Sequence, residues 1–459
     1  MEVRGRLLTV AVIGVCLGLL SWMAVRPRSL ALDERDGAGA GPTTQGSVDA
    51  AATVSGAKRI VIRTPSAASK EAAQPSGGLS TDPVGETSGA EPGAGRTLES
   101  PDDEVAELRR ILGPTFTVTE TRHFVVLSDC GRDWTRARAD LLERTHHQFM
   151  RMMEKIGLPS QTPEHKLPAI MFNEHAAYQA FAKSQDGITA PWVAGYYAAK
   201  GNRIVFYNDS TAPAVERASR HIEEAEVRAE QAKRQAEAAR RERNQESVSK
   251  LERYAAELSA YAADERERIR EHAREAFISK STHEAAHLVA FNCGFQLRSR
   301  QYPFWLTEGV AQCFETTTPN RAFGPDQPVA EREREFERIL LAGESADSPG
   351  LLPLDVLVSL NEVPGGLTTG DGGSGGADAA AVMYPQSYAL FRYLFRFHRE
   401  ALAGYVRDIA GEPPGRISPE RHLVMFSARF GDVAALERQW LLFERTNLES
   451  GQGEDRERR

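Results

Sequence analysis

The segment HEAAH at residues 283–287 carries two histidines four positions apart, with a carboxylate beside the first. On an α-helix, positions i and i+4 are separated by about 40° around the axis, so both imidazole rings can reach one point off the same face. Neutral imidazoles that converge in this way suit Zn²⁺, which binds nitrogen ligands in a tetrahedral shell. The spacing therefore predicts one zinc ion per chain, bound by His283 and His287.

A catalytic zinc needs a third protein ligand and keeps its fourth position for water. Glu308 is the predicted third ligand, because the apolar segment WLTEG at residues 305–309 follows His287 closely and can open a second helix. Gly294 can stop the first helix, which allows the second to cross it. Glu284, next to the first histidine, is the predicted general base that takes a proton from the attacking water.

Two polar residues on the second helix are candidates to support the metal ligands. Gln312 and Glu315 follow Glu308 by four and seven positions, which places them on the same helix face. Either side chain could hydrogen-bond to a ligating histidine and orient its ring. The alternative is that both belong to an ordinary polar face of the helix.

Both motifs resemble those of the gluzincin metallopeptidases, most closely their peptidase-MA-like branch. In pattern, the resemblance covers about residues 115–208 and 280–445, and it is sharp around the two motifs. It implies an α+β fold of the thermolysin type, with a small mixed sheet, zinc-site helices and a helical C-terminal part. Lys280 departs from the family, which has a β-branched residue three positions before the first histidine.

The resemblance also implies two further parts of a peptidase site. Aminopeptidase-type gluzincins carry, just before a helix, a tyrosine whose hydroxyl stabilises the tetrahedral intermediate, and Tyr384 matches its position. The alternative is that Tyr384 is an aromatic helix cap packed in the core. In that fold an edge strand pairs with extended substrate. The candidate strand contains Gly195, Tyr196 and Tyr197, and the alternative is ordinary sheet packing.

The elements that must position these residues follow from hydrophobic periodicity and turn signals. A β-rich segment at 115–128 precedes an amphipathic helix at 134–156, and a second strand at 167–172 precedes a helix at 174–183. Residues 193–198 and 203–207 read as a β-hairpin. Helices are expected at 330–341 and 351–360, followed by one that opens at Met383 and by a bundle that ends near Phe443.

Residues 212–277 interrupt the family pattern with a long helical insertion. Small and apolar residues, mostly alanine, recur at spacings of three and four as far as Ala239, the pattern breaks near Asn244, and it then resumes. This is typical of a close-packed antiparallel helical hairpin. Acidic and basic residues balance within it, which argues against a polyanion partner. The insertion is either a solvated arm or an arm that docks a protein partner or gates the site.

The N-terminal part predicts attachment to a membrane. Residues 7–25 are uncharged and long enough for one crossing, and Arg4 and Arg6 precede them. Residues 31–100 are rich in Gly, Ala, Ser, Thr and Pro, which predicts a disordered tether. We expect a single-pass signal-anchor within residues 1–30 and an extracytoplasmic folded part. The alternative is a cleaved signal and a secreted or periplasmic protein.

Length and composition allow several domains and exclude some partners. A net charge of −8 argues against nucleic acid. Cys293 and Cys313 lie close enough to the two motifs to approach each other, as a thiol pair or as a disulfide. The predicted divisions after the tether are an N-terminal α/β part (101–211), the arm (212–277), the zinc-site helices (278–345), a helical C-terminal part (346–447) and a disordered tail (448–459).

Together these features predict a membrane-tethered zinc peptidase that acts on peptides or proteins. No exopeptidase-type Gly-x-Met-Glu-Asn segment precedes the metal helix, which favours endopeptidase or oligopeptidase action. The rival interpretation is a cell-envelope binding or scaffold protein that keeps the fold but no longer cleaves. A coiled-coil structural protein would explain the arm alone and would leave both metal motifs as coincidences.

Overall fold

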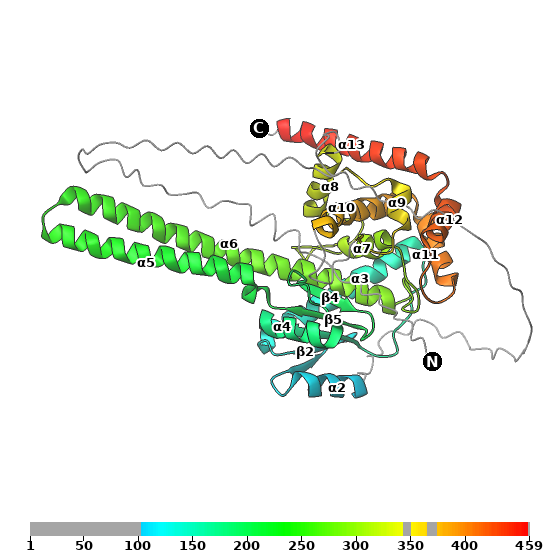
Figure 1. Cartoon of the computed structure of the whole chain (residues 1–459), viewed down its shortest axis with the longest axis horizontal. Coiled ribbons are helices and arrows are strands. Elements are labelled where there is room, and N and C mark those ends of the chain that lie inside the picture. Colours follow the sequence, from blue (N-terminus) through cyan, green and yellow to red (C-terminus); the bar gives the residue numbers. More distant parts are fainter. Residues whose placement is uncertain (1–101, 343–349, 365–373, 458–459) are drawn as a thin grey trace, which may run out of the picture. The chain divides into compact units, whose positions relative to one another are not determined.

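The computed structural model describes residues 102–342, 350–364 and 374–457. The predicted membrane segment 7–25 and the tether 31–100 lie outside these residues. Within the described part, no helix is both long and apolar enough to cross a membrane. The predicted α+β fold is confirmed, because a small mixed sheet is combined with many helices (Figure 1).

The sheet has five strands in the order β1-β2-β3-β5-β4. Their bounds are Thr117–Glu120 for β1, Phe124–Ser128 for β2, Leu167–Phe172 for β3, Gly195–Ala198 for β4 and Arg203–Tyr207 for β5. β2, β3 and β5 run parallel, while β1 and β4 pair antiparallel at the two edges. The β-rich segment at 115–128 therefore forms a hairpin, and β4 is an edge strand.

Alternating side chains of the strands divide the core into two clusters on the two faces of the sheet. Phe124 and Phe206 belong to one cluster, with residues of α3 and of the C-terminal half of α6. Ile170 and Val205 belong to the other, with residues of α2, α4 and the base of the arm. These helices span Asp102–Leu112 (α2), Arg132–Ile156 (α3), His175–Phe181 (α4) and Gln245–Asn292 (α6).

The insertion is a pair of long helices, α5 (Pro213–Arg241) and α6, which lie side by side (Figure 1). Asn244 separates them and caps α6 by accepting a hydrogen bond from the Ser247 N–H at 3.1 Å. Five alanines of α5 are buried along the seam, which allows the two backbones to approach closely; they are Ala225, Ala229, Ala232, Ala236 and Ala239. α6 is one continuous helix of 48 residues, so the returning arm and the metal motif share a single rod.

The base of the arm belongs to the core, so the predicted boundary at residue 277 lies too far along the chain. Phe277 is buried, and its ring centroid lies 4.8 Å from that of Trp134 and 5.5 Å from that of Phe206. Farther out, α5 and α6 mainly contact each other. Ion pairs join them there, including Arg266 to Glu226 at 2.6 Å. The independent part of the arm is therefore shorter than predicted.

We expect the outer arm to be dispensable for folding. Replacing residues 230–262 by about five Gly/Ser residues cuts both helices at about the same level, between the cross-helix ion pairs Arg266–Glu226 and Arg240–Glu252. The new connection spans the roughly 8–10 Å between the helix axes. The shortened protein should retain its thermal unfolding transition and its metal content, because the removed seam buries itself. A matched deletion that extends to Phe277 should unfold the protein. Aggregation of both proteins would show that the whole arm is part of the core.

Glu308 lies on the first of the helices that follow α6, and this helix packs against α6 and two of the later helices. The helices after α6 span Phe304–Gln312 (α7), Ala330–Ala342 (α8), Leu354–Ser359 (α9), Ser374–Phe397 (α10), Arg399–Gly411 (α11), Pro419–Phe430 (α12) and Val433–Glu457 (α13). α10 begins at Ser374, well before the predicted start at Met383. The helix also continues through Pro385, although proline lacks the N–H that a helix interior uses. α13 likewise continues to Glu457, where a disordered tail was expected.

The cysteines of the described part are free thiols. Cys130, Cys293 and Cys313 are all buried, so the disulfide alternative for the last two does not hold here. Cys293 Sγ instead lies 3.8 Å from His146 Nε2. His146 is buried and stacks on His123 with ring centroids 3.9 Å apart. Burial also raises the pKa of the Cys293 thiol to about 12, so this thiol is an inert core group.

Candidate metal centre

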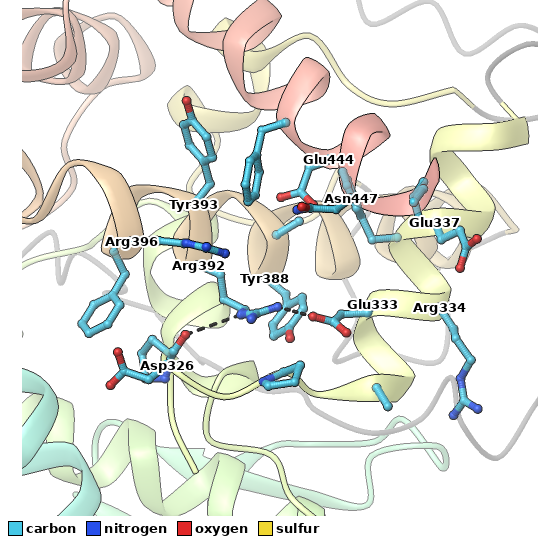
Figure 2. Close-up of a pocket in the computed structure, with 18 of the residues that line it drawn as sticks. Asp326, Glu333, Arg334, Glu337, Tyr388, Arg392, Tyr393, Arg396, Glu444 and Asn447 are labelled. Carbon is cyan, nitrogen blue, oxygen red and sulfur yellow. Dashed lines mark hydrogen bonds and ion pairs between the residues drawn. The ribbon is translucent and has the colours of Figure 1, made fainter. Parts of the chain in front are cut away.

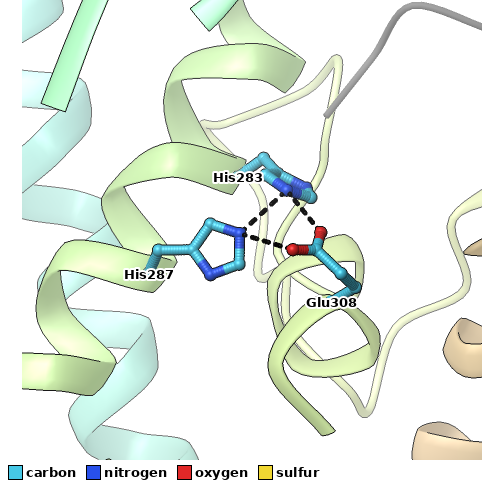
Figure 3. Close-up of side chains that lie close together, drawn as sticks. All are labelled: His283, His287 and Glu308. Atoms are coloured by element: carbon cyan, nitrogen blue, oxygen red, sulfur yellow. Dashed lines mark hydrogen bonds and ion pairs between the residues drawn. The ribbon is translucent and has the colours of Figure 1, made fainter. Parts of the chain in front are cut away.

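His283, His287 and Glu308 converge at one point (Figure 3). The two Nε2 atoms are 3.1 Å apart, and the Glu308 carboxylate oxygens lie 3.3 Å from His283 Nε2 and 3.5 Å from His287 Nε2. Zinc with tetrahedral bonds of about 2.0–2.1 Å requires ligand atoms about 3.3 Å apart. The separations therefore fit a metal ion, and the donor set of two imidazoles and one carboxylate suits zinc.

The electrostatics of these three side chains also favour a cation between them. Burial alone would lower the pKa of His283, but hydrogen bonds to Glu308 and Glu315 outweigh burial and raise the pKa to about 10. Burial opposes ionisation of Glu308 as well, yet the neighbouring histidines hold the pKa of its carboxyl at about 2. The site thus attracts positive charge, and a metal ion would replace the proton on His283.

Glu284 lies next to His283 in the sequence, and its carboxylate forms no hydrogen bond with the described residues. The side chain is fully buried. Burial raises the pKa of Glu284 above its usual range. A buried carboxylate without partners is costly, so it calls for a function or a ligand. A cation beside it would favour its ionised form.

A buried chain of charged groups orients His283. Its Nδ1 lies 2.9 Å from Glu315 Oε1, so that nitrogen carries the proton shared with the carboxylate and leaves Nε2 for a metal. Arg332 of α8 donates from Nε to Glu315 Oε2 at 2.8 Å and from Nη1 to Glu335 Oε2 at 2.5 Å. Glu315 therefore occupies the supporting place predicted for it, held by an arginine that the sequence pattern did not reveal.

Gln312, the other supporting candidate, contacts neither histidine in the described structure. Its amide donates to the backbone carbonyl of Glu308 at 3.2 Å, within α7. Thr307, earlier in the same helix, accepts a hydrogen bond from Gln296 Nε2 at 2.9 Å. That contact ties α7 to the turn that follows α6. Gln312 and Gln296 therefore secure the helix that carries the third ligand, without touching a ligand side chain.

Two glycines allow α7 to reach the metal helix. Gly294 has a φ of 95°, a left-handed conformation that ends α6. Gly309, next to Glu308, faces α10 so closely that a Cβ there would lie 2.5 Å from the Ser387 carbonyl oxygen. The glycine of the WLTEG segment is thus required by helix packing, and it positions Glu308.

Tyr384 lies within α10, although a position just before a helix was expected. The side chain is buried, and its ring packs edge-to-face on Phe304, the first residue of α7, with centroids 5.0 Å apart. The structure thereby brings it to the helix that carries Glu308. Its neighbour Tyr388 has a structural role, because its hydroxyl accepts a hydrogen bond from the Val329 N–H at 2.8 Å.

The candidate substrate strand, β4, passes beside the metal helix. A Cβ on Gly195 would come within 3.1 Å of the Lys280 side chain, so strand and helix are in tight contact there. The hydroxyl of Tyr196 donates to Asp186 at 2.7 Å, and that of Tyr197 donates to Asn202 at 3.0 Å. Both tyrosine side chains are thus used in packing, and all four residues of β4 are buried.

Lys280 is the residue that most clearly departs from expectation. It is 1% exposed, and its ammonium group donates to Asp209 Oδ2 at 2.7 Å and to the Tyr207 carbonyl oxygen at 3.1 Å. The same ammonium lies 4.2 Å from the centroid of the Tyr207 ring. This ion pair joins the metal helix to the end of β5 and to the base of the arm.

We expect Lys280→Met to cost about 3–5 kcal/mol of unfolding free energy, because it leaves the Asp209 carboxylate buried without its cation. Chemical denaturation measures this loss. Lys155→Met is the matched control, since its partner Asp326 is half-exposed and such pairs contribute at most about 1 kcal/mol. Equal losses in the two variants would contradict a structural role for the buried pair.

The family described as "Protein of unknown function (DUF1570)" matches residues 277–415. Comparison with curated proteins finds no match to the chain. The matched segment begins at Phe277 and contains all three candidate ligands, Glu284 and the Glu315–Arg332 pair, but neither the sheet nor the outer arm.

Proposed function

We propose that the chain is a zinc-dependent peptidase of the gluzincin type. The observation that carries this proposal is Glu284, a buried carboxylate without a hydrogen-bond partner among the described residues, beside a convergent His-His-Glu set. A purely structural zinc site is closed by four protein ligands and has no use for such a base. Three ligands plus an adjacent carboxylate are the arrangement that hydrolysis by an activated water requires.

In the proposed reaction, a zinc ion held by His283, His287 and Glu308 would lower the pKa of a water molecule and polarise the scissile carbonyl. Glu284 takes the proton from the attacking water and later gives it to the leaving amine nitrogen. Tyr384 donates a hydrogen bond to the oxygen that becomes negative. Glu315 and Arg332 keep the His283 ring in the tautomer that presents Nε2.

The proposed setting is the outer side of a membrane, with residues 7–25 as the anchor and residues 31–100 as the tether. The proposed substrates are peptides or proteins, and endopeptidase or oligopeptidase action is favoured over removal of terminal residues. The backbone edge of β4 would pair with the extended substrate. A protein that docks on the arm would act close to the metal helix, because α6 carries both.

A second candidate function is a cell-envelope binding or scaffold protein that keeps the metal but does not cleave. Burial favours it, because His283, Glu284 and His287 are each 0% exposed and Glu308 is 2% exposed. A peptide can reach such a site only if the surrounding elements move. A scaffold needs no such motion.

Digestion of a proteome-derived peptide library separates the two functions. The purified full-length protein, loaded with zinc, is incubated with the library, and new termini are identified by mass spectrometry. The peptidase proposal expects cleavage that stops when the zinc is removed by a chelator and returns when zinc is restored. A zinc-loaded protein that leaves the whole library intact would favour the scaffold function.

A further inference from the structure

A cavity separate from the metal centre lies between α8, α10 and α13 (Figure 2). Its volume is about 710 Å³, within the range of about 300–1,000 Å³ that small-molecule sites occupy. Tyr388 and Arg392 line it from one face of α10, while Ser387 on another face of that helix packs against Gly309. The cavity therefore has its own walls and shares only α10 with the metal centre.

Two arginines of α10 enter the cavity in different ways. Arg392 is held, because it donates to the Glu333 carboxylate and to the Pro325 carbonyl oxygen at 3.5 Å. Arg396, one turn later, has no ion pair or hydrogen bond with the described residues. Its guanidinium lies 5.4 Å from the centroid of the Phe443 ring. A guanidinium stacked on an aromatic ring keeps its N–H groups available for a ligand.

The facing wall comes from α13 and offers Glu444 and Asn447 (Figure 2). Glu444 accepts a hydrogen bond from Trp440 Nε1 at 3.2 Å and forms no ion pair with the described residues. Burial raises the pKa of its carboxyl to about 7, so the group is partly protonated at neutral pH and can donate a hydrogen bond. Arg396, Asn447 and a protonated Glu444 can thus offer hydrogen-bond donors to the cavity, whose lining also includes the acidic residues Asp326, Glu333 and Glu337.

We propose that this cavity binds an organic carboxylate. The ligand's charged group pairs with Arg396, because guanidinium and carboxylate match as a two-point pair. Asn447 and the Glu444 carboxyl complete the donor set, and the apolar part of the ligand packs on Phe443. Two kinds of ligand could supply this carboxylate: a free small acid, or a peptide through its C-terminal carboxylate. The site does not depend on the proposed peptidase activity.

Isothermal titration calorimetry on the full-length protein tests the site with four probes: 3-phenylpropionate, its amide, the tripeptide Ac-Gly-Gly-Phe and the same tripeptide amidated. We expect one or both acids to bind and both amides to fail. Arg396→Gln should weaken acid binding at least about tenfold, because it removes the charge and the two-point pair with the carboxylate. Arg407→Gln, an exposed arginine on α11, is the matched control and should bind like wild type.

Glu444→Gln separates a carboxylate ligand from a cation. The amide keeps a donor and removes the charge, so acid binding should persist or tighten, whereas a cation would lose its partner. Binding of the free acid alone, or of the peptide acid alone, supports the proposal and identifies the source. Failure of both acids to bind at about millimolar concentration, or equal binding by Arg396→Gln with unchanged thermal unfolding, overturns it.

Discussion

Replacing Glu308 by alanine is expected to remove zinc from the protein. The two imidazoles alone cannot hold the ion, because the Glu308 carboxylate closes the triangle at 3.3 and 3.5 Å and supplies its negative charge. Loss of a supporting hydrogen bond costs about 10–100-fold in metal affinity, so loss of a ligand should exceed that range. Metal content after dialysis, measured by inductively coupled plasma mass spectrometry, should fall from about one ion per chain to almost none.

Two variants on the same stretch of chain bracket this result. Gln312→Ala removes a side chain whose amide donates to the Glu308 backbone carbonyl and not to a candidate ligand atom, so zinc should remain. Glu315→Gln weakens the hydrogen bond to His283 and should lower zinc affinity by about 10–100-fold. Retention of full zinc content by Glu308→Ala would place the third ligand elsewhere. An equal loss in all three variants would point to unfolding of α7 instead.

Glu284→Gln is expected to abolish peptide cleavage while the protein keeps its zinc. The amide has the size of the carboxylate but cannot accept a proton, and general-base catalysis is worth about 10²–10⁴-fold. Cleavage of a library peptide should therefore slow by at least about a hundredfold, with unchanged zinc content and a melting temperature near or above that of wild type. The last expectation follows because the unpartnered buried carboxylate destabilises the native protein.

Tyr384→Phe isolates the oxyanion donor. Loss of such a donor in comparable sites costs about 2.7–4 kcal/mol of transition-state stabilisation, or about 10²–10³ in rate. Tyr388→Phe is the control on the next turn of α10. The Tyr388 hydroxyl accepts a hydrogen bond from the Val329 N–H, so this variant should lower stability more than the cleavage rate. If wild type and Glu284→Gln hold zinc and are equally inert on a broad library, the scaffold function replaces the peptidase.

Local sequence was sufficient to predict that the two histidines converge and to predict most of the helices and strands. The His-to-His spacing of four residues works because helix geometry alone places i and i+4 on one face, and α6 does carry both rings to one point. The recurrence of small residues at spacings of three and four likewise predicted the seam between the two helices of the arm. The break in this pattern near Asn244 lies where α5 ends and α6 begins. In each case a spacing of three or four residues determines the structure, so the prediction requires no information about the rest of the chain.

Helix boundaries near proline were predicted less well. The helix that contains Pro385 was predicted to open at Met383. α10 nevertheless starts at Ser374 and passes through Pro385, because packing against α7 and α8 outweighs one lost hydrogen bond. The predicted end of the arm at residue 277 was misplaced because of similar tertiary contacts. Phe277 follows the helical repeat of the arm, yet it packs against Trp134 and Phe206, which are distant in sequence.

Only the tertiary structure assigned the charged partners around the site. Arg332 lies in the acidic and basic run EREREFE at 331–337, which reads as a solvated helix face, yet it is 4% exposed and clamps Glu315. Lys280 and Asp209 are separated by 71 residues, and neither has a local pattern that names the other. A buried charge is stable only beside its partner, and which partner comes within about 3 Å depends on how distant helices pack, a property that no local spacing contains.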